Sequence, residues 1–530
     1  MKRNKNTGPA VSRNIDCLLT STLILLFVSY GLFFGSIRPL MTTVLAAPWH
    51  RGLTLPLMWV YLIVAIIIIR NSGRIRSWDM FHKVVFIFSV AFVLRFTINL
   101  VSDIEPISDF RNYVNMGKMF VNRHFDWIAG ISDSYGLPSF GGIAVFNGII
   151  MHLFSATVFG LQIGDCIITS MIAVMIMYIG SLYSEKLGLV CGVLYAFYPS
   201  NIVNSVLPTN QHGATLFLLI SVYSLLYVVM KEKNNKTLLC IVSGCSLAAS
   251  YFMHPSIHTH IIAYTVFVLI IVIRNIKNRT KVLQVLKCGL IIAVSLILSL
   301  MSVFWVMKET GLIRQNTRQM TMLSKIVVGL NRETGGGYSS EDYSMFRALD
   351  MPEQNELARQ VIRERFFAEG LVSNTIFFTT KIDKMWFAVD HYHFIVTAMD
   401  EFEATSDAVT DTTNVLARRL LSALNDLDKL YVPFVFLFAA LGIVAKLQDS
   451  SPIFSLCRWI ILGWIGVHLF IEVHPRYRYI CMPFFFILAS TGIVYVIESA
   501  PKIKGFFNGK LKQYINKDKK TRALSKEHNR

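Results

Sequence analysis

Apolar runs long enough to cross a lipid bilayer recur along this chain, and they constrain its fold more than any other feature. A membrane-spanning helix needs about 20 consecutive and mostly apolar residues. Of all residues here, 54% are hydrophobic and 16% are charged, whereas soluble globular proteins carry about 25% charged residues. We therefore predict an all-α polytopic membrane protein. The twelve expected spans are roughly 17–36, 54–70, 84–101, 163–183, 188–206, 213–230, 238–253, 258–273, 287–306, 431–446, 455–472 and 479–498.

Lysine and arginine in the short loops predict how these spans are oriented. The basic segments are the N-terminus, the loop 70–83, "KEKNNK" (231–236), the loop 274–287 and the tail after Pro501. All of them fall in the cytoplasm only if one further apolar run, 141–159, does not cross. This run follows "PSFGG" and contains glycines that disfavour a spanning helix. We therefore expect it to lie flat in the outer interface or to re-enter. Both termini are then cytoplasmic, and the protein lies in the plasma membrane.

This topology divides the chain into five regions. They are 1–83, a cytoplasmic start with two extra spans; 84–306, a transmembrane core with a first outer loop at 102–162; 307–430, a long outer loop; 431–500, the C-terminal spans; and 501–530, a basic cytoplasmic tail. The long outer loop has more acidic than basic residues, and it contains two amphipathic stretches, 352–370 and 413–427. The net charge of +18 is therefore a signal of topology, and we expect no nucleic-acid partner.

The stretch "EPISDFRNYVNMGKMF" (105–120) places several polar residues at the outer mouth of the third span. Pro106 disfavours helical geometry at the residue before it, and Ser108 is expected to cap a short interfacial helix with Asp109 in its first turn. An acid there suits the helix dipole, which is the simpler interpretation. Alternatively, a carboxylate fixed at the water–lipid boundary can act as a general base.

Other polar residues gather at the predicted outer turns. They are Asn210, Gln211 and His212 in "LPTNQHG", His254 in "MHPS", and Arg476 and Arg478 in "HPRYRY". Positive charge in an outer loop opposes the orientation rule, and a lipid phosphate is a natural partner for paired guanidinium groups. The alternative is that these arginines snorkel or pair with Glu472.

Two further kinds of residue qualify as phosphate ligands. Arg95 lies inside a predicted span, where a charge needs a partner; Asp103, Glu105 and a ligand phosphate are the candidates. Lys381 and its neighbour Lys384 lie in the late outer loop, where they could also simply snorkel.

Metal binding has little support in the sequence. The pairs His258 and His260, and His391 and His393, have spacings that some metal sites use. No Cys, His or Asp completes a ligand set around either pair. No cofactor is therefore certain, although a divalent metal stays possible.

Taken in order, these segments resemble the GT-C superfamily of glycosyltransferases over roughly 85–495. The resemblance is closest to bacterial members of family 39, such as protein O-mannosyltransferases and the aminoarabinose transferases of lipid A. It rests on "PISDFRNY", "PSFGGIAVFNGIIMHLF", "VLYAFYPSNIVNSVLPTNQHG", "VVGLNRETGGGYSSEDYSMF" and "HPRYRYICMPFFFILASTGI". The family pattern differs at two places: Asn210-Gln211-His212 replace a frequent acid, and His254 replaces a common arginine.

The resemblance implies a polyprenyl-phosphate-linked sugar donor and an inverting transfer on the outer face. The acceptor would be a cell-surface glycan, a lipid or a protein, and Asp109 aligns with the catalytic aspartate of the family. We expect a pocket between 102–162, 207–212, 307–430 and Arg476–Arg478, open to the outer leaflet. The predicted substrate-binding residues are Arg476, Tyr477, Arg478, Arg111, Tyr113, Glu105, Asn210, Gln211, His212, His254 and Lys381.

Other classes of membrane protein fit twelve spans with both ends inside. A secondary transporter or a polysaccharide flippase is one alternative, although pseudosymmetric halves and a matching pair of broken helices are not visible. A polysaccharide polymerase or ligase is another, and it would use an arginine–histidine site in a late loop without needing Asp109. A transporter would place its polar residues at the bilayer midplane, whereas here they gather at the outer edge.

Overall fold

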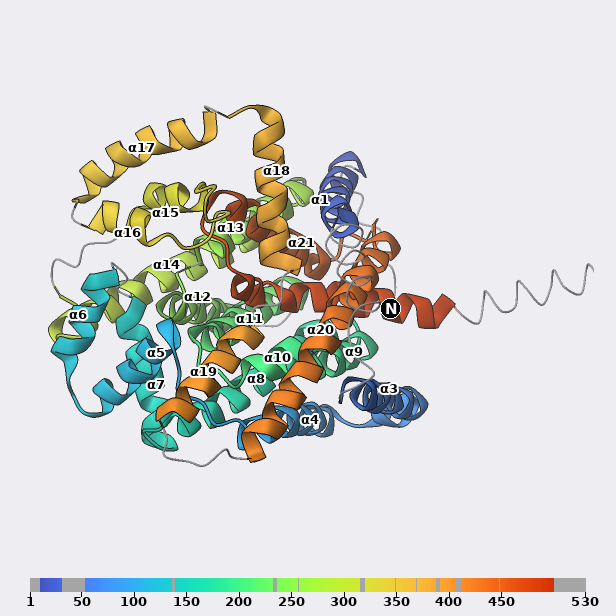
Figure 1. The fold of residues 1–530 in the computed structure, drawn as a ribbon. Helices are drawn as coiled ribbons and strands as arrows, with labels where there is room; N and C mark the ends of the chain where they lie inside the picture. The colour runs from blue at the N-terminus through green and yellow to red at the C-terminus, as the bar shows by residue number, and fades with distance from the viewer. Residues whose placement is uncertain are drawn as a thin grey trace, which may run out of the picture.

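The computed structural model describes residues 10–30, 53–135, 139–231, 236–255, 257–314, 320–347, 349–367, 369–387, 391–405, 412–447 and 449–499. These residues form a bundle of helices without strands (Figure 1), which agrees with the predicted all-α membrane fold. The basic tail 501–530, the first nine residues and most of "KEKNNK" lie outside the described residues.

The helices follow one another with short connections. The first part of the chain forms α1 Ala10–Tyr30, α3 Thr54–Ser77, α4 Met80–Leu100, α5 Ser108–Val121, α6 Phe125–Tyr135, α7 Ser139–Leu153, α8 Val158–Ser181, α9 Glu185–Ala196, α10 Pro199–Asn204, α11 Asn210–Met230, α12 Lys236–Met253, α13 Ile257–Arg274 and α14 Arg279–Glu309. The second part forms α15 Met322–Gly329, α16 Ser340–Arg347, α17 Met351–Phe367, α18 Leu371–Ile382, η3 Asp383–Phe387, α19 His391–Thr405, α20 Thr412–Ala445, α21 Pro452–Phe470, η4 Pro475–Ile480 and a C-terminal helix, Met482–Ser499.

Eight of the described helices are long and apolar enough to cross a membrane. They are Met80–Leu100, Val158–Ser181, Asn210–Met230, Lys236–Met253, Arg279–Glu309, Val415–Ala445, Pro452–Phe470 and Met482–Ser499. Each coincides with one of the twelve expected spans. The other four expectations are not confirmed: the described parts of α1 and α13 count as shorter apolar helices, and α3 is a helix at 54–77.

The fourth of these, the expected span 188–206, is not one continuous helix. α9 ends at Ala196, and α10 begins at Pro199 after two non-helical residues. Proline suits the first turn of a helix but disfavours helical geometry at the residue before it, and Tyr198 is extended here. At 1.5 Å per residue, α9 alone reaches only about 18 Å. The expected span 188–206 is therefore two successive helices rather than one continuous helix.

Polar contacts at one end of the bundle join helix ends that are far apart in the sequence. Lys83 at the start of α4 donates to Glu185 at the start of α9 (2.9 Å). Tyr183, just after α8, donates to Asp449, just before α21 (2.9 Å). The start of α4 and the end of α8 therefore lie at the same end of the bundle, so these two helices run in opposite directions.

The segment between α4 and α8 begins and ends at the same end of the bundle. Near the other end of α4, Asn99 donates to the sulfur of Cys166, near the start of α8 (3.3 Å). α8 thus begins where α4 finishes, and α5, α6 and α7 together make no net crossing. This agrees with the prediction that 141–159 does not carry the chain across the membrane.

The glycines of this run, however, do not break a helix. They lie inside α7, where they allow other helices to approach closely. A Cβ atom on Gly148 would lie 2.2 Å from the ring of Phe120 in α5, and one on Gly142 would lie 2.6 Å from Phe252 in α12. Small residues commonly let membrane helices pack at short distance. The glycines therefore serve packing, which the sequence interpretation missed.

The described helices of the predicted long outer loop form a layer beside the bundle. In Figure 1, α15, α16 and α17 lie together at one edge, and α18 leads back toward α21. Val327, Phe346 and Ala358 form a small separate core, and the buried Asp342 accepts hydrogen bonds from Arg365 at 2.7 and 2.9 Å. The amphipathic helix expected at 352–370 is confirmed as α17. The one expected at 413–427 is the first half of α20.

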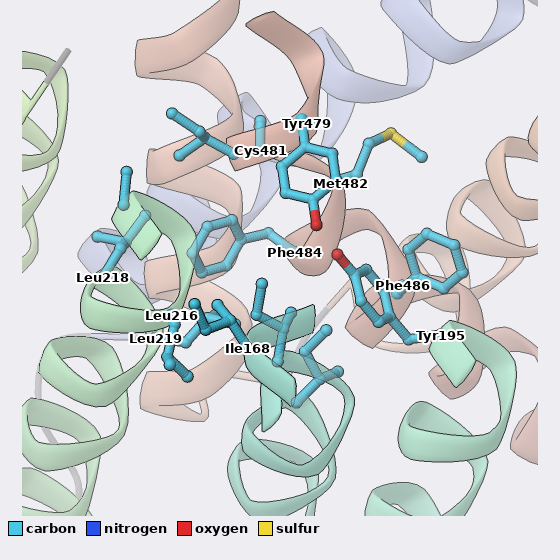
Figure 2. Packing of buried hydrophobic residues seen from close by; sticks show 14 of the residues in the cluster. Ile168, Tyr195, Leu216, Leu218, Leu219, Tyr479, Cys481, Met482, Phe484 and Phe486 are labelled. Atoms are coloured by element: carbon cyan, nitrogen blue, oxygen red, sulfur yellow. The ribbon is translucent and has the colours of Figure 1, made fainter. Parts of the chain in front are cut away.

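The main core surrounds the C-terminal helix. Figure 2 shows Phe484 near Leu216 and Leu218 of α11, and Phe486 on the side of Tyr195. The ring centroids of Tyr195 and Phe486 are 5.1 Å apart. This aromatic packing fixes η4, which immediately precedes the C-terminal helix and carries the arginines of "HPRYRY".

Candidate functional site

The first turn of α5 and the short helix η4 bring Asp109 and Arg476 into direct contact. Oδ2 of Asp109 accepts a hydrogen bond from Nη2 of Arg476 at 2.6 Å. The two side chains are 31% and 14% exposed, respectively, so water reaches the carboxylate more readily than the guanidinium group. Charge-assisted hydrogen bonds of this kind are among the strongest in proteins. The contact joins the first predicted outer loop to the last one.

The backbone beside Asp109 has an unusual conformation. Ser108 has a φ angle of +51°, a left-handed conformation that is uncommon outside glycine. Its side chain does not cap α5, because Ile107 takes the cap position without a side-chain hydrogen bond. The prediction of a Ser108 cap is therefore wrong. Such backbone outliers concentrate at functional sites, and this one immediately precedes Asp109.

Arg476 is held by η4 and by aromatic rings. The His474 side chain accepts a hydrogen bond from the backbone N–H of Arg476 (3.3 Å). The guanidinium carbon lies 5.5 Å from the ring centroid of Phe110 and 5.7 Å from that of Tyr477, which favours its positive charge. Burial by itself lowers the pKa of Arg476, but Tyr477, Tyr113 and Asp109 raise that pKa above its ordinary value. Arg476 therefore stays cationic.

Glu472 links this region to α16 in the layer beside the bundle. Its two carboxylate oxygens accept hydrogen bonds from the hydroxyl groups of Tyr343 in α16 (2.8 Å) and Tyr477 in η4 (3.3 Å). Arg476 pairs with Asp109 rather than with Glu472, which was the alternative partner in the sequence. The predicted long outer loop thus contributes, through Tyr343, to the surroundings of Tyr477.

His254, from the turn between α12 and α13, packs on the same tyrosine. Its ring centroid lies 5.9 Å from that of Tyr477 in an edge-to-face arrangement. Burial and, to a smaller extent, the positive charge of Arg476 lower the pKa of His254 to about 3. At neutral pH His254 is therefore an uncharged member of the site.

Tyr113 lies behind Asp109 on the buried face of α5. Its ring centroid is 6.3 Å from that of Phe110 and 6.2 Å from that of Phe140 in α7, and its carbonyl accepts a hydrogen bond from Asn147 (2.9 Å). Burial raises the pKa of Tyr113, so its hydroxyl stays protonated. It supports the start of α5 more than it offers a reactive group.

Glu105 and Arg111 connect the first predicted outer loop to α19. The backbone N–H of Glu105 donates to the carbonyl of Ala398 (3.0 Å). Arg111 donates to the carbonyl of Pro106 and to Glu401, at 2.9 Å in both cases. These two predicted substrate-binding residues lie close to Asp109 in sequence, but their observed partners belong to the protein.

Arg478 and Lys381 are bonded elsewhere. Arg478 donates to the carbonyl of Trp386 and approaches Asp428 at 3.4 Å, and both charged side chains are nearly inaccessible to solvent. Nζ of Lys381 donates to the carbonyls of Gly329, Leu469 and Ile471 at 2.5, 2.8 and 2.9 Å. Each side chain joins segments of the protein and has its donors largely occupied.

Asn210, Gln211 and His212 form the buried first turn of α11 rather than an open loop. Asn210 donates to the carbonyl of Met253 (2.8 Å). Nδ1 of His212 lies 3.0 Å from Oδ1 of Asp165 in α8, and both side chains are almost fully buried. The His212 ring also packs against Tyr479, with 5.2 Å between centroids. These residues lie inside the bundle, and their observed polar partners do not include Asp109.

Arg95 is fully buried and meets neither Asp103 nor Glu105 among its hydrogen-bonding partners. Its Nη1 donates to the carbonyls of Ala91 and Ala196 (2.8 and 3.1 Å). The second of these carbonyls ends α9, where a positive charge suits the helix dipole. The break between α9 and α10 therefore provides a partner for a charge inside the bundle.

Sequence reasoning missed three buried or bridging acids. Asp165 lies within the apolar run "LQIGDCIITS", and a charge there was itself a signal. Asp428 sits in the amphipathic start of α20, where an acid attracts no notice. Glu472 was considered only as a partner of arginine, since the tyrosine that binds it, Tyr343, is 129 positions away.

Metal ligands do not gather at this site. Across the described residues, no group of three or more His, Cys, Asp or Glu side chains is placed to hold a metal ion. His254, His468 and His474 all approach Tyr477 with their rings at 5.8–5.9 Å, which is aromatic packing.

Comparison with known proteins agrees with the membrane fold. A family model described as "Conserved hypothetical integral membrane protein" matches residues 166–491, which is more than half of the 530 residues. The match begins in α8 and ends in the C-terminal helix, so that it includes Arg476 but not Asp109. No curated protein matches the chain. The chain is an integral membrane protein that belongs to this family of conserved hypothetical integral membrane proteins.

Proposed function

We propose that this protein is an inverting glycosyltransferase that moves a sugar from a polyprenyl-phosphate-linked donor to an extracytoplasmic acceptor. The observation that carries the proposal is the contact between Asp109 and Arg476. Such a transfer needs a base for the acceptor hydroxyl and a cation for the donor phosphate, and these two side chains supply both at one point. The acceptor is a cell-surface polysaccharide, a teichoic acid, a lipid or a protein.

In the proposed reaction, the acceptor hydroxyl oxygen attacks the anomeric carbon from the face opposite the phosphate. A new carbon–oxygen bond forms while the bond from the anomeric carbon to the phosphate oxygen breaks. The electron pair of the broken bond leaves with the polyprenyl phosphate, and Asp109 takes the hydroxyl proton. A placed base of this kind is worth about 10²–10⁴ in rate.

Arg476 can serve the phosphate and the base together. Its Nη2 already donates to Asp109, while its Nε is buried and lacks a hydrogen-bond partner among the described residues. Since guanidinium groups offer five N–H donors in a rigid plane, Nε is available for a phosphate oxygen while Nη2 retains Asp109. One side chain would then set the distance between leaving group and base.

Surface glycans provide the test. Mass spectrometry would compare glycans from cells that produce the wild-type protein, no protein, or the Asp109→Asn variant at equal abundance in the membrane. We expect the surface glycans of cells without the protein and of cells with Asp109→Asn to lack the same sugar. If loss of the protein changes the glycans but Asp109→Asn does not, the site is wrong, and a polymerase or ligase that does not need Asp109 is favoured.

A secondary transporter is the second candidate, because the bundle contains buried titratable groups. Asp165 and His212 lie 3.0 Å apart in its interior, and Nε and Nη2 of the buried Arg95 lack hydrogen-bond partners among the described residues. Buried ionisable residues in membrane proteins often mark ion or substrate pathways. A transporter would leave surface glycans unchanged when it is deleted, and a small solute would accumulate on one side of the membrane.

A further inference from the structure

The donor phosphate would need more positive charge than Arg476 alone supplies. A polyprenyl-phosphate-linked sugar is a phosphodiester with one negative charge, whereas the departing polyprenyl phosphate is a monoester whose second pKa is near 6, so that it carries nearly two at neutral pH. A cation that meets the leaving group would stabilise this growing charge. The cations expected from sequence do not fill this role readily, since Lys381 and Arg478 are bonded to the protein itself.

The helix α15 places a different lysine beside the site. Its last residue, Gly329, sits directly on the turn after α21, since a Cβ there would lie 2.2 Å from the carbonyl oxygen of Phe470. Lys325 lies four residues earlier, so it shares the face of α15 that Gly329 presents to this turn. Glu472 and η4 follow this turn directly in the chain.

Lys325 interacts electrostatically with charged and titratable groups of several elements. The negative charge of Glu472 acts on Lys325, and the positive charge of Lys325 acts on His254 and His258 at the start of α13. Arg476 acts on the same His254. Two cations, Arg476 and Lys325, therefore lower the pKa of one histidine, which is itself uncharged.

The ammonium group of Lys325 is poorly compensated there. Its side chain is half-buried, and within the described part of the chain its Nζ makes no hydrogen bond and comes within ion-pair distance of no acid. Burial lowers the pKa of Lys325, although Glu472 opposes this change. Because a partly buried charge without a hydrogen-bonded partner is costly, such a group favours an incoming anion.

We propose that Lys325 is the second cation of the phosphate subsite and acts with Arg476. The inference rests on the proposed glycosyltransferase function and names the group that meets the leaving phosphate. Arg476 would orient the phosphate through planar paired hydrogen bonds, and Lys325 would act as a mobile point charge. No sequence motif marks Lys325, which lies in the plain apolar stretch "LSKIVVG".

The test measures binding and lysine reactivity without any need for the acceptor. The purified full-length protein in nanodiscs is treated with an amine-acetylating reagent, with and without polyprenyl phosphate, and the acetylation of each lysine is quantified by mass spectrometry. We expect polyprenyl phosphate to protect Lys325 but not Lys308, an exposed lysine at the end of α14. Polyprenol without phosphate should protect neither residue. Inorganic phosphate alone is a second probe: it protects Lys325 only if the subsite recognises the phosphate without the lipid.

Two variants of Lys325 and one control variant complete the test. Native mass spectrometry should show that Lys325→Gln weakens polyprenyl phosphate binding about tenfold, as expected for the loss of a charge-assisted hydrogen bond, while Lys325→Arg and the control Lys308→Gln bind nearly as the wild type. Equal binding by Lys325→Gln, or unprotected Lys325 in a protein that does bind polyprenyl phosphate, overturns the role of Lys325. Absence of polyprenyl phosphate binding in the wild type instead overturns the proposed donor class itself.

Discussion

The ion pair between Asp109 and Arg476 should be measurable as a coupling free energy. Exposed ion pairs contribute about 0.2–1 kcal/mol, whereas removing one partner of a fully buried pair costs about 3–5 kcal/mol. This pair lies between those limits, because its atoms are 2.6 Å apart while Asp109 is 31% and Arg476 14% exposed. We expect a coupling of about 1–2 kcal/mol. Asp109→Asn should be the costlier single change, since it leaves the more buried group without its charged partner.

The assay is reversible unfolding in mixed detergent micelles, applied to the wild type, Asp109→Asn, Arg476→Gln and the double variant. The double-mutant cycle isolates the pairwise term from the other contacts of each side chain, including the packing of Arg476 on Phe110. If the costs of the two single changes add to within about 0.3–0.5 kcal/mol, the residues do not interact. The candidate site would then lose its main geometric support.

Three further predictions concern the surroundings of the site. The pKa of His254 is lowered to about 3, so below pH 6.5 the unfolded chain binds a proton at this residue more readily than the folded chain does. The free energy of unfolding, measured by tryptophan fluorescence, should therefore fall from pH 6.5 toward pH 3 by up to about 1.4 kcal/mol per pH unit. His254→Gln should flatten this dependence. Arg478→Gln leaves the buried Asp428 without its cation and should destabilise the protein by about 3–5 kcal/mol, whereas a variant that also carries Asp428→Asn should recover much of this loss in the same assay. Gly148→Ala places a methyl group against an aromatic ring at 2.2 Å and should cost about 1–3 kcal/mol. Gly130→Ala, where the added atom meets nothing within 4 Å, is its control; equal thermal stability of the two would refute the packing of α5 on α7.

The membrane fold was largely predictable because it depends on local composition. The length and apolarity of each run identify eight helices, and the parity of the basic loops predicts that 141–159 makes no net crossing. The exception at 188–206 shows the limit of this reasoning, since hydropathy alone does not register that Pro199 divides the run into two helices.

The candidate site was only partly predictable. Asp109 and Arg476 were both singled out, but their contact spans 367 positions and depends on how α5 packs against η4. The same limitation affected the lysines: Lys381 and Lys325 both lie in the late loop, and only the folded chain shows that three carbonyls already hold Lys381. Whether a polar side chain faces the protein or a ligand is decided by tertiary packing, which local patterns do not report.

The central claim is that the protein consumes a lipid-linked sugar at Asp109. Its most direct test measures two pools in the same cells: polyprenyl-phosphate-linked sugars in the lipid extract, and sugars on the surface glycans. For Asp109→Asn at wild-type abundance, the account predicts that one lipid-linked sugar accumulates while the same sugar disappears from the surface. If neither pool differs from the wild type, the account is contradicted.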